Sequence, residues 1–301
     1  MSLEHFRQRA RSQSTAIVAV ADAADLEVLE SVQMAVREGL ASFLLFGNES
    51  KMVHLAKQSF PELLSTDAVT FVPTQSATDA ATKAVQSVSS GEATVLMKGH
   101  VPTATLLKAV LNKEWGLRTG AVLSHVAAFE VDGFERLIWV TDAAMNIAPD
   151  LTQKAQIIQN SISIATSVGI NKPKVAVLTA VEVVNPSMQA TLDAAALVQM
   201  ASRGQIKGAS VDGPLALDNA ISITAAEHKG IKGEVAGNAD ILMVPTIEAG
   251  NVLYKSLVYF ANAKVGAVIA GAKAPIVLTS RADSAESKLY SLALAICTTS
   301  N

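Results

Sequence analysis

The chain has a single cysteine, Cys297, among its 301 residues. One cysteine excludes an internal disulfide framework and any zinc or iron–sulfur site built from several cysteines. Aromatic residues make up only 4% of the chain and charged residues 17%, whereas 50% of the residues are hydrophobic. This composition excludes intrinsic disorder and supplies ample apolar material for a large buried core, in one large domain or two of ordinary size.

Long hydrophobic runs are also missing, although the mean hydropathy of +0.33 is high for a soluble protein. Polar side chains interrupt the longest uncharged stretch, Ala155 to Asn171, so we expect no membrane-spanning helix. The start of the chain, MSLEHFRQRARSQ, is polar and basic, which predicts no secretory signal and a cytoplasmic protein. The net charge of −3 argues against nucleic acid as a partner.

Several common catalytic signatures are absent as well. The sequence contains no G-x-G, which excludes the dinucleotide-binding fingerprint, and no G-x-S-x-G elbow for a nucleophilic serine. Gly266 and Gly271 have the spacing of a P-loop, but the following Ala-Lys-Ala displaces the lysine and lacks the hydroxyl residue, so we expect no nucleotide triphosphatase. The five histidines form no i,i+3 or i,i+4 pair, so no helical metal site is predicted.

Short apolar runs alternate with longer amphipathic ones, which predicts βα units and a mostly parallel sheet. Nearly continuous apolar runs suit strands that helices cover on both faces. Asp132-Gly133, between two further strand-like segments, predicts a hairpin and therefore a mixed sheet. The other candidate strands are Ala16–Ala21, Ser42–Phe46, Thr94–Met97, Leu137–Val140, Val175–Thr179, Ile241–Val244 and Ile276–Thr279.

Apolar residues at helical spacing predict two helix faces that pack in the core. Cys297 falls in the second of them, so we interpret it as a buried, inert thiol. No linker, low-complexity tract or internal repeat marks a domain boundary. The two stripes are Val28, Leu29, Val32 and Val36, and Leu289, Leu292, Ala293 and Ile296.

Polar residues follow several candidate strands, where helix N-termini present unpaired N–H groups to anions. After the last strand, Ser280 is followed by Arg281, which can grip a phosphate or form a surface ion pair. Asp283 and Glu286 are candidates for a capping box on a helix that begins near Ser284. This junction is the first candidate for an anion site.

Three other segments carry candidate binding residues. Lys98 follows a strand and either contacts an anion or is simply solvated. Gly250 permits close backbone approach, and Asn251 either caps the next helix or orients a ligand oxygen. Asp212 lies in SVDGPL, which we expect to be a turn, although its carboxylate is also available to a ligand.

Several stretches in combination resemble the phosphate acetyl/butyryltransferase family. They are VDGPLALDNAI (211–221), EVAGNADILMVPTIEAGNVLYKSL (234–257) and LTSRADSAES (278–287). The resemblance extends back through KGHVPTATLLKAVLNKEWGLRTGAVLSH (98–125) and TDAAMNIAPDLTQKAQI (141–157), and so covers most of the chain. D-G-P-L, P-x-x-x-A-G-N and S-R together are specific to the family, and the K-G-H and L-R-T-G segment is closer to its phosphate butyryltransferases.

The resemblance implies a fold and an assembly. The family fold has two α/β domains, with a mostly parallel mixed sheet and an interdomain cleft, and is similar to isocitrate and isopropylmalate dehydrogenases. By analogy, residues 1–130 with 268–301 form one domain and residues 131–267 the other. Family members are usually homodimers, so we expect a dimer or a higher homo-oligomer, with no metal and no bound cofactor.

The activity implied is the reversible transfer of a short-chain acyl group, butyryl or branched, between coenzyme A and inorganic phosphate. CoA and phosphate would react directly in a ternary complex, so acyl-CoA and phosphate are the expected partners. Ser280 matches the family serine that hydrogen-bonds the developing charge, and Arg281 matches the arginine that grips phosphate. The residues expected to bind substrate are Lys98, Gly99, Asp212, Gly250, Asn251, Lys255 and Tyr259.

The sequence departs from the acetyl-type enzymes at two positions. Those enzymes carry an aspartate, proposed as the base, where this chain has Ser287, so Glu286 or Asp283 would have to supply a base. A second arginine of theirs aligns with Tyr259, and loss of that cation would favour larger acyl groups unless Tyr259 is core packing.

Three alternatives remain open. An acetyl-specific transferase would differ only in the volume of its pocket. A dehydrogenase of the related fold would need nicotinamide and metal sites that the motifs do not provide. A non-catalytic protein that binds acyl-CoA or phosphate would keep the scaffold and lose turnover.

Overall fold

A computed structural model describes residues 1–12, 15–278 and 284–299. The chain forms two compact units, which we call the N-terminal unit and the central unit. The N-terminal unit comprises residues 3–121 and 266–301, and the central unit comprises residues 1–2 and 122–265. The division into domains after residues 130 and 267 stays a prediction.

The N-terminal unit contains a sheet in the order β3-β2-β1-β4-β11-β10. Its pairs are parallel except for β10 and β11, which are antiparallel. Because five strands run the same way, their carboxyl ends meet at one edge. The strands are β1 (Ile17–Ala21), β2 (Ser42–Gly47), β3 (Val69–Pro73), β4 (Val95–Lys98), β10 (Lys264–Ala270) and β11 (Ile276–Val277).

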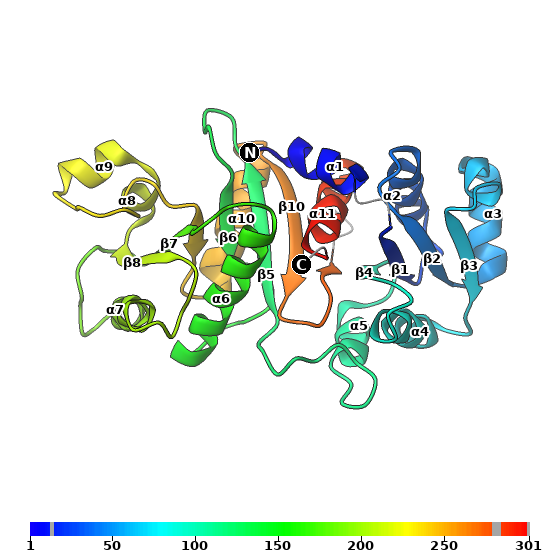
Figure 1. Ribbon diagram of the computed structural model, residues 1–301, viewed down its shortest axis with the longest axis horizontal. Helices are drawn as coiled ribbons and strands as arrows, with labels where there is room; N and C mark the ends of the chain where they lie inside the picture. The colour runs from blue at the N-terminus through cyan, green and yellow to red at the C-terminus, as the bar shows by residue number, and fades with distance from the viewer. Residues whose placement is uncertain (13–14, 279–283, 300–301) are drawn as a thin grey trace. The chain divides into compact units, whose positions relative to one another are not determined.

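Helices follow these strands, and side-chain caps mark where several of them begin. Asp25 accepts a hydrogen bond from the Val28 N–H, and Ser76 caps the helix after β3 in the same way. Figure 1 places α1 beside α11, the first and last helices of the chain. The helices are α1 (Leu3–Ser12), α2 (Leu26–Arg37), α3 (Glu49–Ser59), α4 (Ala77–Ser89), α5 (Thr103–Val110) and α11 (Ala285–Thr298), with a 3-10 turn, η1 (Pro61–Leu64).

The core of this unit confirms both helix faces. Val28, Leu29 and Val32 are buried on α2, while Val36 is half-buried, and the four stripe residues of α11 are all buried. Strand β1 is almost entirely inaccessible, as expected for a strand covered on both faces.

The central unit contains a sheet in the order β5-β6-β9-β7-β8. Strands β5 and β6 form the antiparallel hairpin that Asp132-Gly133 predicts, and the other pairs are parallel. The mixed α/β fold is therefore confirmed. The strands are β5 (Ser124–Glu130), β6 (Ile138–Thr141), β7 (Lys174–Leu178), β8 (Ser210–Leu215) and β9 (Ile241–Met243).

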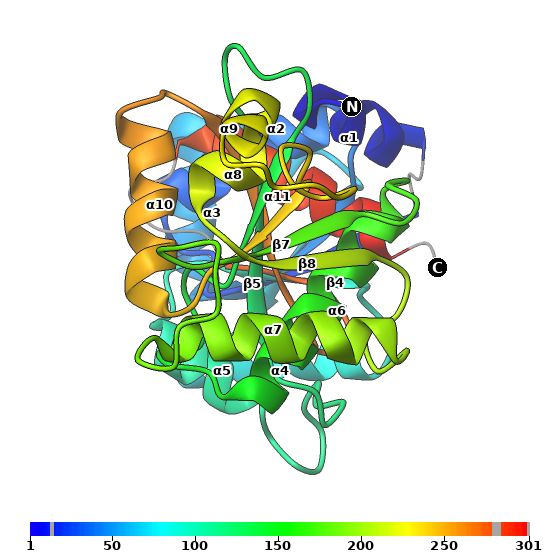
Figure 2. The ribbon, with the colours of Figure 1, turned by 90° about the vertical axis from the view of Figure 1, so that its left-hand side faces the viewer.

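Helices cover both sides of the β7–β8 pair. Figure 2 shows α7 on one side and α8 and α9 on the other. The longest helix, α6, begins with a capping box between Asp150 and Gln153. The helices are α6 (Leu151–Ser167), α7 (Gln189–Ser202), α8 (Leu217–Ile221), α9 (Ile223–His228) and α10 (Ile247–Tyr259).

Each of the seven candidate strand ranges contains a strand, but the turn expected at Ser210–Leu215 is wrong. This segment is strand β8, at the edge of the sheet, in register with β7 across a local shift. Gly213 lies so close to β7 that a Cβ there would be 2.9 Å from the Val177 carbonyl oxygen. The Gly-Pro pair therefore serves close packing within a strand, and it does not reverse the chain.

Candidate active site

The carboxyl edge of the N-terminal unit brings a buried lysine to the end of a strand. Lys98 is the last residue of β4, is only 9% exposed, and donates from Nζ to the Gly99 carbonyl oxygen at 3.1 Å. The alternative of a solvated lysine is therefore wrong. A buried ammonium at this edge is suited to an anion, because burial strengthens its interaction with an opposite charge.

Gly99 is packed against the backbone that follows the neighbouring strand β1. A Cβ on Gly99 would clash with the Asp22 carbonyl oxygen and lie 2.7 Å from the Ala21 carbonyl oxygen. The next residue, His100, donates its backbone N–H to the Asp22 carbonyl at 2.7 Å. Only glycine fits this crossing, and the crossing fixes the position of the Lys98 backbone.

Charged side chains surround the start of α2 at the same edge. His100 Nδ1 lies 3.5 Å from an oxygen of Asp25, the cap of α2. Lys288 of α11 is buried, and its Nζ lies 3.1 Å from Glu27 of α2. This edge thus holds two buried ammonium groups, on Lys98 and Lys288.

The residues matched to the family serine and arginine come between β11 and α11 in the sequence. Ser280, Arg281 and Asp283 lie outside the described residues. They follow β11, the neighbour of β4 in the sheet. Their roles stay predictions.

The helix start expected near residue 284 is confirmed, but the capping box is not the one predicted. Ser284 is the cap, and its hydroxyl accepts from the Ser287 N–H. Glu286 is the second residue of the helix, so its side chain points along the helix, where it accepts from the Tyr290 hydroxyl at 3.0 Å. Position 287 is therefore a structural partner of the cap.

In the central unit, Gly250 makes the equivalent close approach. A Cβ on Gly250 would be 2.7 Å from the Asp142 carbonyl oxygen and 2.9 Å from the Ala143 Cα. Asp142 follows β6, and Gly250 lies in the helix that follows β9, the parallel neighbour of β6. The expected close backbone approach at Gly250 is therefore confirmed.

Sequence reasoning missed Asp142 as the organiser of this loop. Its carboxylate is buried and accepts the backbone N–H groups of Ala144, Met145 and Asn146. The Asn146 amide also donates to it at 2.6 Å and reaches the Leu123 carbonyl. A turn-forming D-x-x-x-N was visible in the sequence, but its burial against α10 was not.

Asn251 is not a cap, so the capping alternative is wrong. The cap of α10 is Thr246, and Asn251 is an exposed residue of the second turn. Lys255 and Tyr259 lie farther along the same helix, with the Lys255 Nζ 5.8 Å from the centre of the Tyr259 ring. Tyr259 is 64% exposed, which excludes the core-packing alternative.

Asp212 lies away from the carboxyl ends of the strands. It faces a pocket of about 340 Å³ on edge strand β8, near Lys172, Ser210 and Glu234. The Ser210 hydroxyl and then the Lys172 ammonium lower the pKa of Glu234. Lys172 precedes β7 and Ser210 begins β8, so this pocket lies toward the amino ends of the strands, unlike Gly250.

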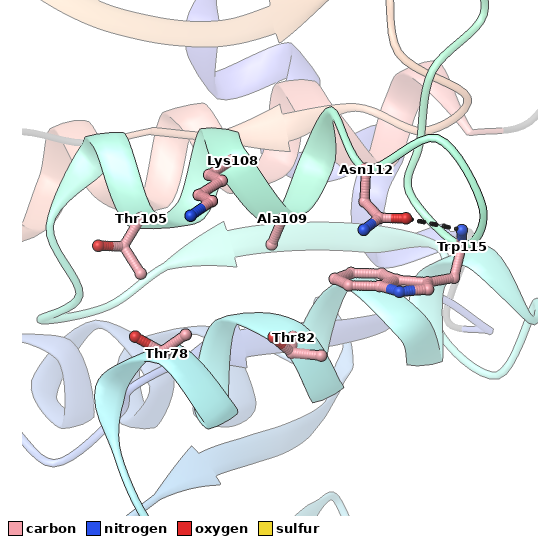
Figure 3. A pocket seen from close by; sticks show the side chains of 7 residues that line it. All are labelled: Thr78, Thr82, Thr105, Lys108, Ala109, Asn112 and Trp115. Carbon is pink, nitrogen blue, oxygen red and sulfur yellow. Dashed lines mark hydrogen bonds between the residues drawn. The ribbon is translucent and has the colours of Figure 1, made fainter.

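A pocket of about 250 Å³ lies between α4 and α5 of the N-terminal unit. Figure 3 shows Lys108 and the Trp115 indole in the groove, with threonine side chains on both helices. Asn112 closes the turn after α5 by accepting the backbone N–H groups of Glu114 and Trp115. One cation, several hydroxyls and one aromatic face suit a ligand that joins an anion to a flat ring. No motif in the sequence marks this pocket.

Comparison with known proteins identifies the family. A family model described as "Phosphate acetyl/butaryl transferase" matches residues 54–296. The chain belongs to this family. It is therefore an acyltransferase of the phosphate acetyl/butyryl type, as the resemblance implies.

Individual relatives match over nearly their whole length. A Bacillus subtilis (strain 168) protein named "Probable phosphate butyryltransferase" is 56% identical, covering 99% of this chain and 98% of the relative. A phosphate butyryltransferase of Clostridium acetobutylicum is 49% identical, covering 100% and 99%. The crystal structure of a branched-chain phosphotransacylase from Enterococcus faecalis V583 has a TM-score of 0.84 and 38% identity, covering 95% and 100%.

The single thiol of this transferase is buried on α11. Burial raises the pKa of Cys297 to about 11, and its Sγ contacts the Phe6 carbonyl oxygen at 3.4 Å. The interpretation of Cys297 as a buried thiol is confirmed. Within the ranges that the structure describes, no three His, Cys, Asp or Glu residues are grouped to hold a metal ion. No helix in those ranges is long and apolar enough to span a membrane.

Proposed function

We propose that the protein reversibly transfers a short-chain acyl group, butyryl or branched, between coenzyme A and inorganic phosphate. The observation that carries the proposal is the full-length identity of about half to relatives named for butyryl transfer. The family name also covers acetyl transfer, so phosphate acetyltransferase activity is the second candidate. A non-catalytic acyl-CoA-binding or phosphate-binding protein is the third.

The chemistry we propose is one direct displacement. The CoA thiolate attacks the carbonyl carbon of the acyl phosphate, a C–S bond forms, and the C–O bond to phosphate breaks with its electron pair leaving on phosphate. In reverse, a phosphate oxygen attacks the thioester and the thiolate leaves. Catalysis then consists of positioning two anions and stabilising the oxyanion between them.

In this proposal the N-terminal unit binds the phosphate. Ser280 hydrogen-bonds the developing charge, Arg281 grips phosphate, and Glu286 or Asp283 serves as base if one is used. The buried Lys98, held in place by Gly99, supports an anion site at this edge. The pocket between α4 and α5, which Lys108 and Trp115 line, suits the nucleotide end of CoA. CoA joins phosphates, which suit the lysine, to an aromatic base, which suits the indole.

The central unit carries the other residues that we propose to bind substrate. Gly250 holds the start of α10 against the Asp142 loop, and the exposed Asn251, Lys255 and Tyr259 are available to substrate on that helix. Asp212 is the weakest member of the predicted set, because it lies toward the amino ends of the strands.

We also propose a homodimer or higher homo-oligomer, a cytoplasmic location and no bound cofactor. The exposed aromatic side chain of Phe260, at the end of α10, supports association, since large exposed aromatic groups are enriched at interfaces. Light scattering on the purified protein measures the oligomeric state directly.

The decisive test follows free thiol in a mixture of the protein and butyryl-CoA, with and without inorganic phosphate. Phosphate-dependent release is the expected result, and acetyl-CoA and isobutyryl-CoA rank the acyl groups. Release without phosphate would identify a thioesterase. CoA binding without release would favour the non-catalytic alternative.

A further inference from the structure

The central unit exposes large apolar side chains at one edge of its sheet. Strands β6, β9, β7 and β8 are parallel, so the segments after them leave from the same edge. Each of these four segments carries an exposed apolar residue. We call them the apolar edge set: Ile147 after β6, Val252 after β9, Val183 and Val184 after β7, and Leu217 after β8.

Hydrogen bonds join these segments in pairs. The Ile247 N–H donates to the Ile147 carbonyl at 2.9 Å, which ties the loop after β6 to the start of α10. The Asn219 amide donates to Glu182 at 3.3 Å, which ties α8 to the loop after β7. Because neighbouring strands are about 4.8 Å apart, four adjacent strand ends span about 15 Å. The segments that carry the set therefore all leave from one short edge.

The exposure of these side chains is built into well-bonded loops. The loop before Ile147 is fixed by the Asp142 carboxylate. The loop after Val184 is fixed by Asn185, whose backbone N–H and carbonyl both bond the Thr191 hydroxyl. The folded chain thus holds Ile147, Val183 and Val184 at 69%, 63% and 53% exposure.

Singly scattered apolar residues on a surface are ordinary, but several on one ligand-binding edge indicate an apolar ligand. The negative charge at this edge also favours an uncharged ligand group. Glu248 lies in the first turn of α10, and hydrogen bonds from its own backbone N–H and from Thr246 lower its pKa. A carboxylate there repels an anion, so the edge is suited to the uncharged part of the substrate.

We infer that the apolar edge set contacts the acyl chain of the thioester and determines its length preference. This inference rests on the proposed function and deepens it. An acetyl group has one methyl to bury, whereas a butyryl or branched group has further methylene or methyl groups. In apolar sites one such group changes kcat/KM by about tenfold or more.

The test uses variants of the full-length protein that make the side chain polar, with the volume kept at the two valines and one methyl group lost at isoleucine. They are Ile147→Thr and the double variant Val183→Thr, Val184→Thr. Ile223→Thr is the matched control, since Ile223 is 52% exposed at the start of α9, outside the set. All of these positions are exposed, so we expect unchanged thermal unfolding.

The measurement is kcat/KM for butyryl-CoA, isobutyryl-CoA and acetyl-CoA at saturating phosphate. Both edge variants are expected to lower the ratio of butyryl to acetyl about tenfold, while the control keeps the ratio of the unmodified protein. An unchanged ratio, or an equal loss with all three thioesters, would overturn the inference alone. An unmodified protein without phosphate-dependent turnover would overturn the proposed function.

A second copy of the chain is the other conceivable occupant of this edge. Light scattering on the same variants distinguishes the two. We expect the same mass for all of them. A drop in mass for Ile147→Thr or the double valine variant, with the acyl ratio unchanged, would identify the edge as a subunit interface and overturn the inference.

Discussion

The carboxyl edges of the two units offer opposite chemistry to a ligand. The edge of the N-terminal unit has buried ammonium groups, on Lys98 and Lys288, among acidic partners. The edge of the central unit has exposed isoleucine, valine and leucine side chains and a carboxylate, Glu248. The edge of the N-terminal unit therefore suits an anion, and the edge of the central unit suits an apolar group.

The two edges are nevertheless built by the same device. Gly99 and Gly250 each pack on the carbonyl of an aspartate that follows the neighbouring parallel strand, Asp22 and Asp142. In both units, the absence of a Cβ lets a strand-to-helix segment cross close to its neighbour. The difference between the edges therefore comes from the side chains they carry.

The largest expected effect is on stability. It concerns a buried ion pair of the central unit that we expect to be structural, unlike the buried lysines at the edge of the N-terminal unit. In the central unit, Lys154 of α6 and Asp193 of α7 are both buried and pair at 2.6 Å. Asp193→Ala leaves a buried ammonium without that partner, so the free energy of unfolding should fall by about 3–5 kcal/mol. Urea unfolding measures the loss. Asp218→Ala is the control, because Asp218 forms an exposed ion pair with Lys229. We expect it to change the free energy of unfolding by less than about 1 kcal/mol.

The charge proposed at the N-terminal edge is tested by Arg281→Ala. This change removes a charge-assisted contact to phosphate worth about 3 kcal/mol, so phosphate-dependent turnover should fall about a hundredfold. Steady-state kinetics with varied phosphate measures it. Arg37→Ala is the control, because Arg37 is a surface arginine paired with Glu62. Activity of Arg281→Ala equal to that of the unmodified protein would remove Arg281 from the site.

The shared glycine device is tested by Gly99→Ala and Gly250→Ala. Each new methyl group meets backbone atoms that cannot move freely, so each variant should lose about 1–3 kcal/mol of stability. Gly99→Ala should lose more, because its clash with the Asp22 carbonyl is closer. Thermal unfolding compares them with Ala249→Ser, an exposed neighbour on α10 that should cost about 0.5 kcal/mol or less. Unaltered stability in both glycine variants would contradict the packing argument.

The smallest effect is expected at Cys297, which lies at neither edge. Cys297→Ser should keep nearly full activity, since direct displacement uses no thiol nucleophile. The folded state raises the pKa of this thiol from about 9 to about 11, so the folded protein binds more protons than the unfolded chain in that window. Stability should therefore decline as pH rises from 9 to 11, and less steeply in Cys297→Ser. A large loss of activity would contradict the mechanism.

The sequence by itself determined the elements whose signals are local. Continuous apolar runs identified strands that are buried on both faces, such as β1. Asp132-Gly133 identified the hairpin because turn residues between two apolar runs are a local signal, although the connection from β5 to β6 spans residues 131–137. Motif combinations identified the family and proposed the roles of Ser280 and Arg281. The helix start near residue 284 was also predictable, because a cap acts within one turn.

Only the tertiary structure decided features that depend on distant parts of the chain. Asp212 lies in a strand because β7 packs against Gly213, and Asn251 lies inside a helix because Thr246 begins it. The burial of Lys98 and the exposure of Ile147 could not be read from local sequence, since each depends on segments far away in the chain. Strand order placed the segments of Val183 and Val184, Leu217 and Val252 at one edge with the segment of Ile147, and no local pattern records which strand ends become neighbours.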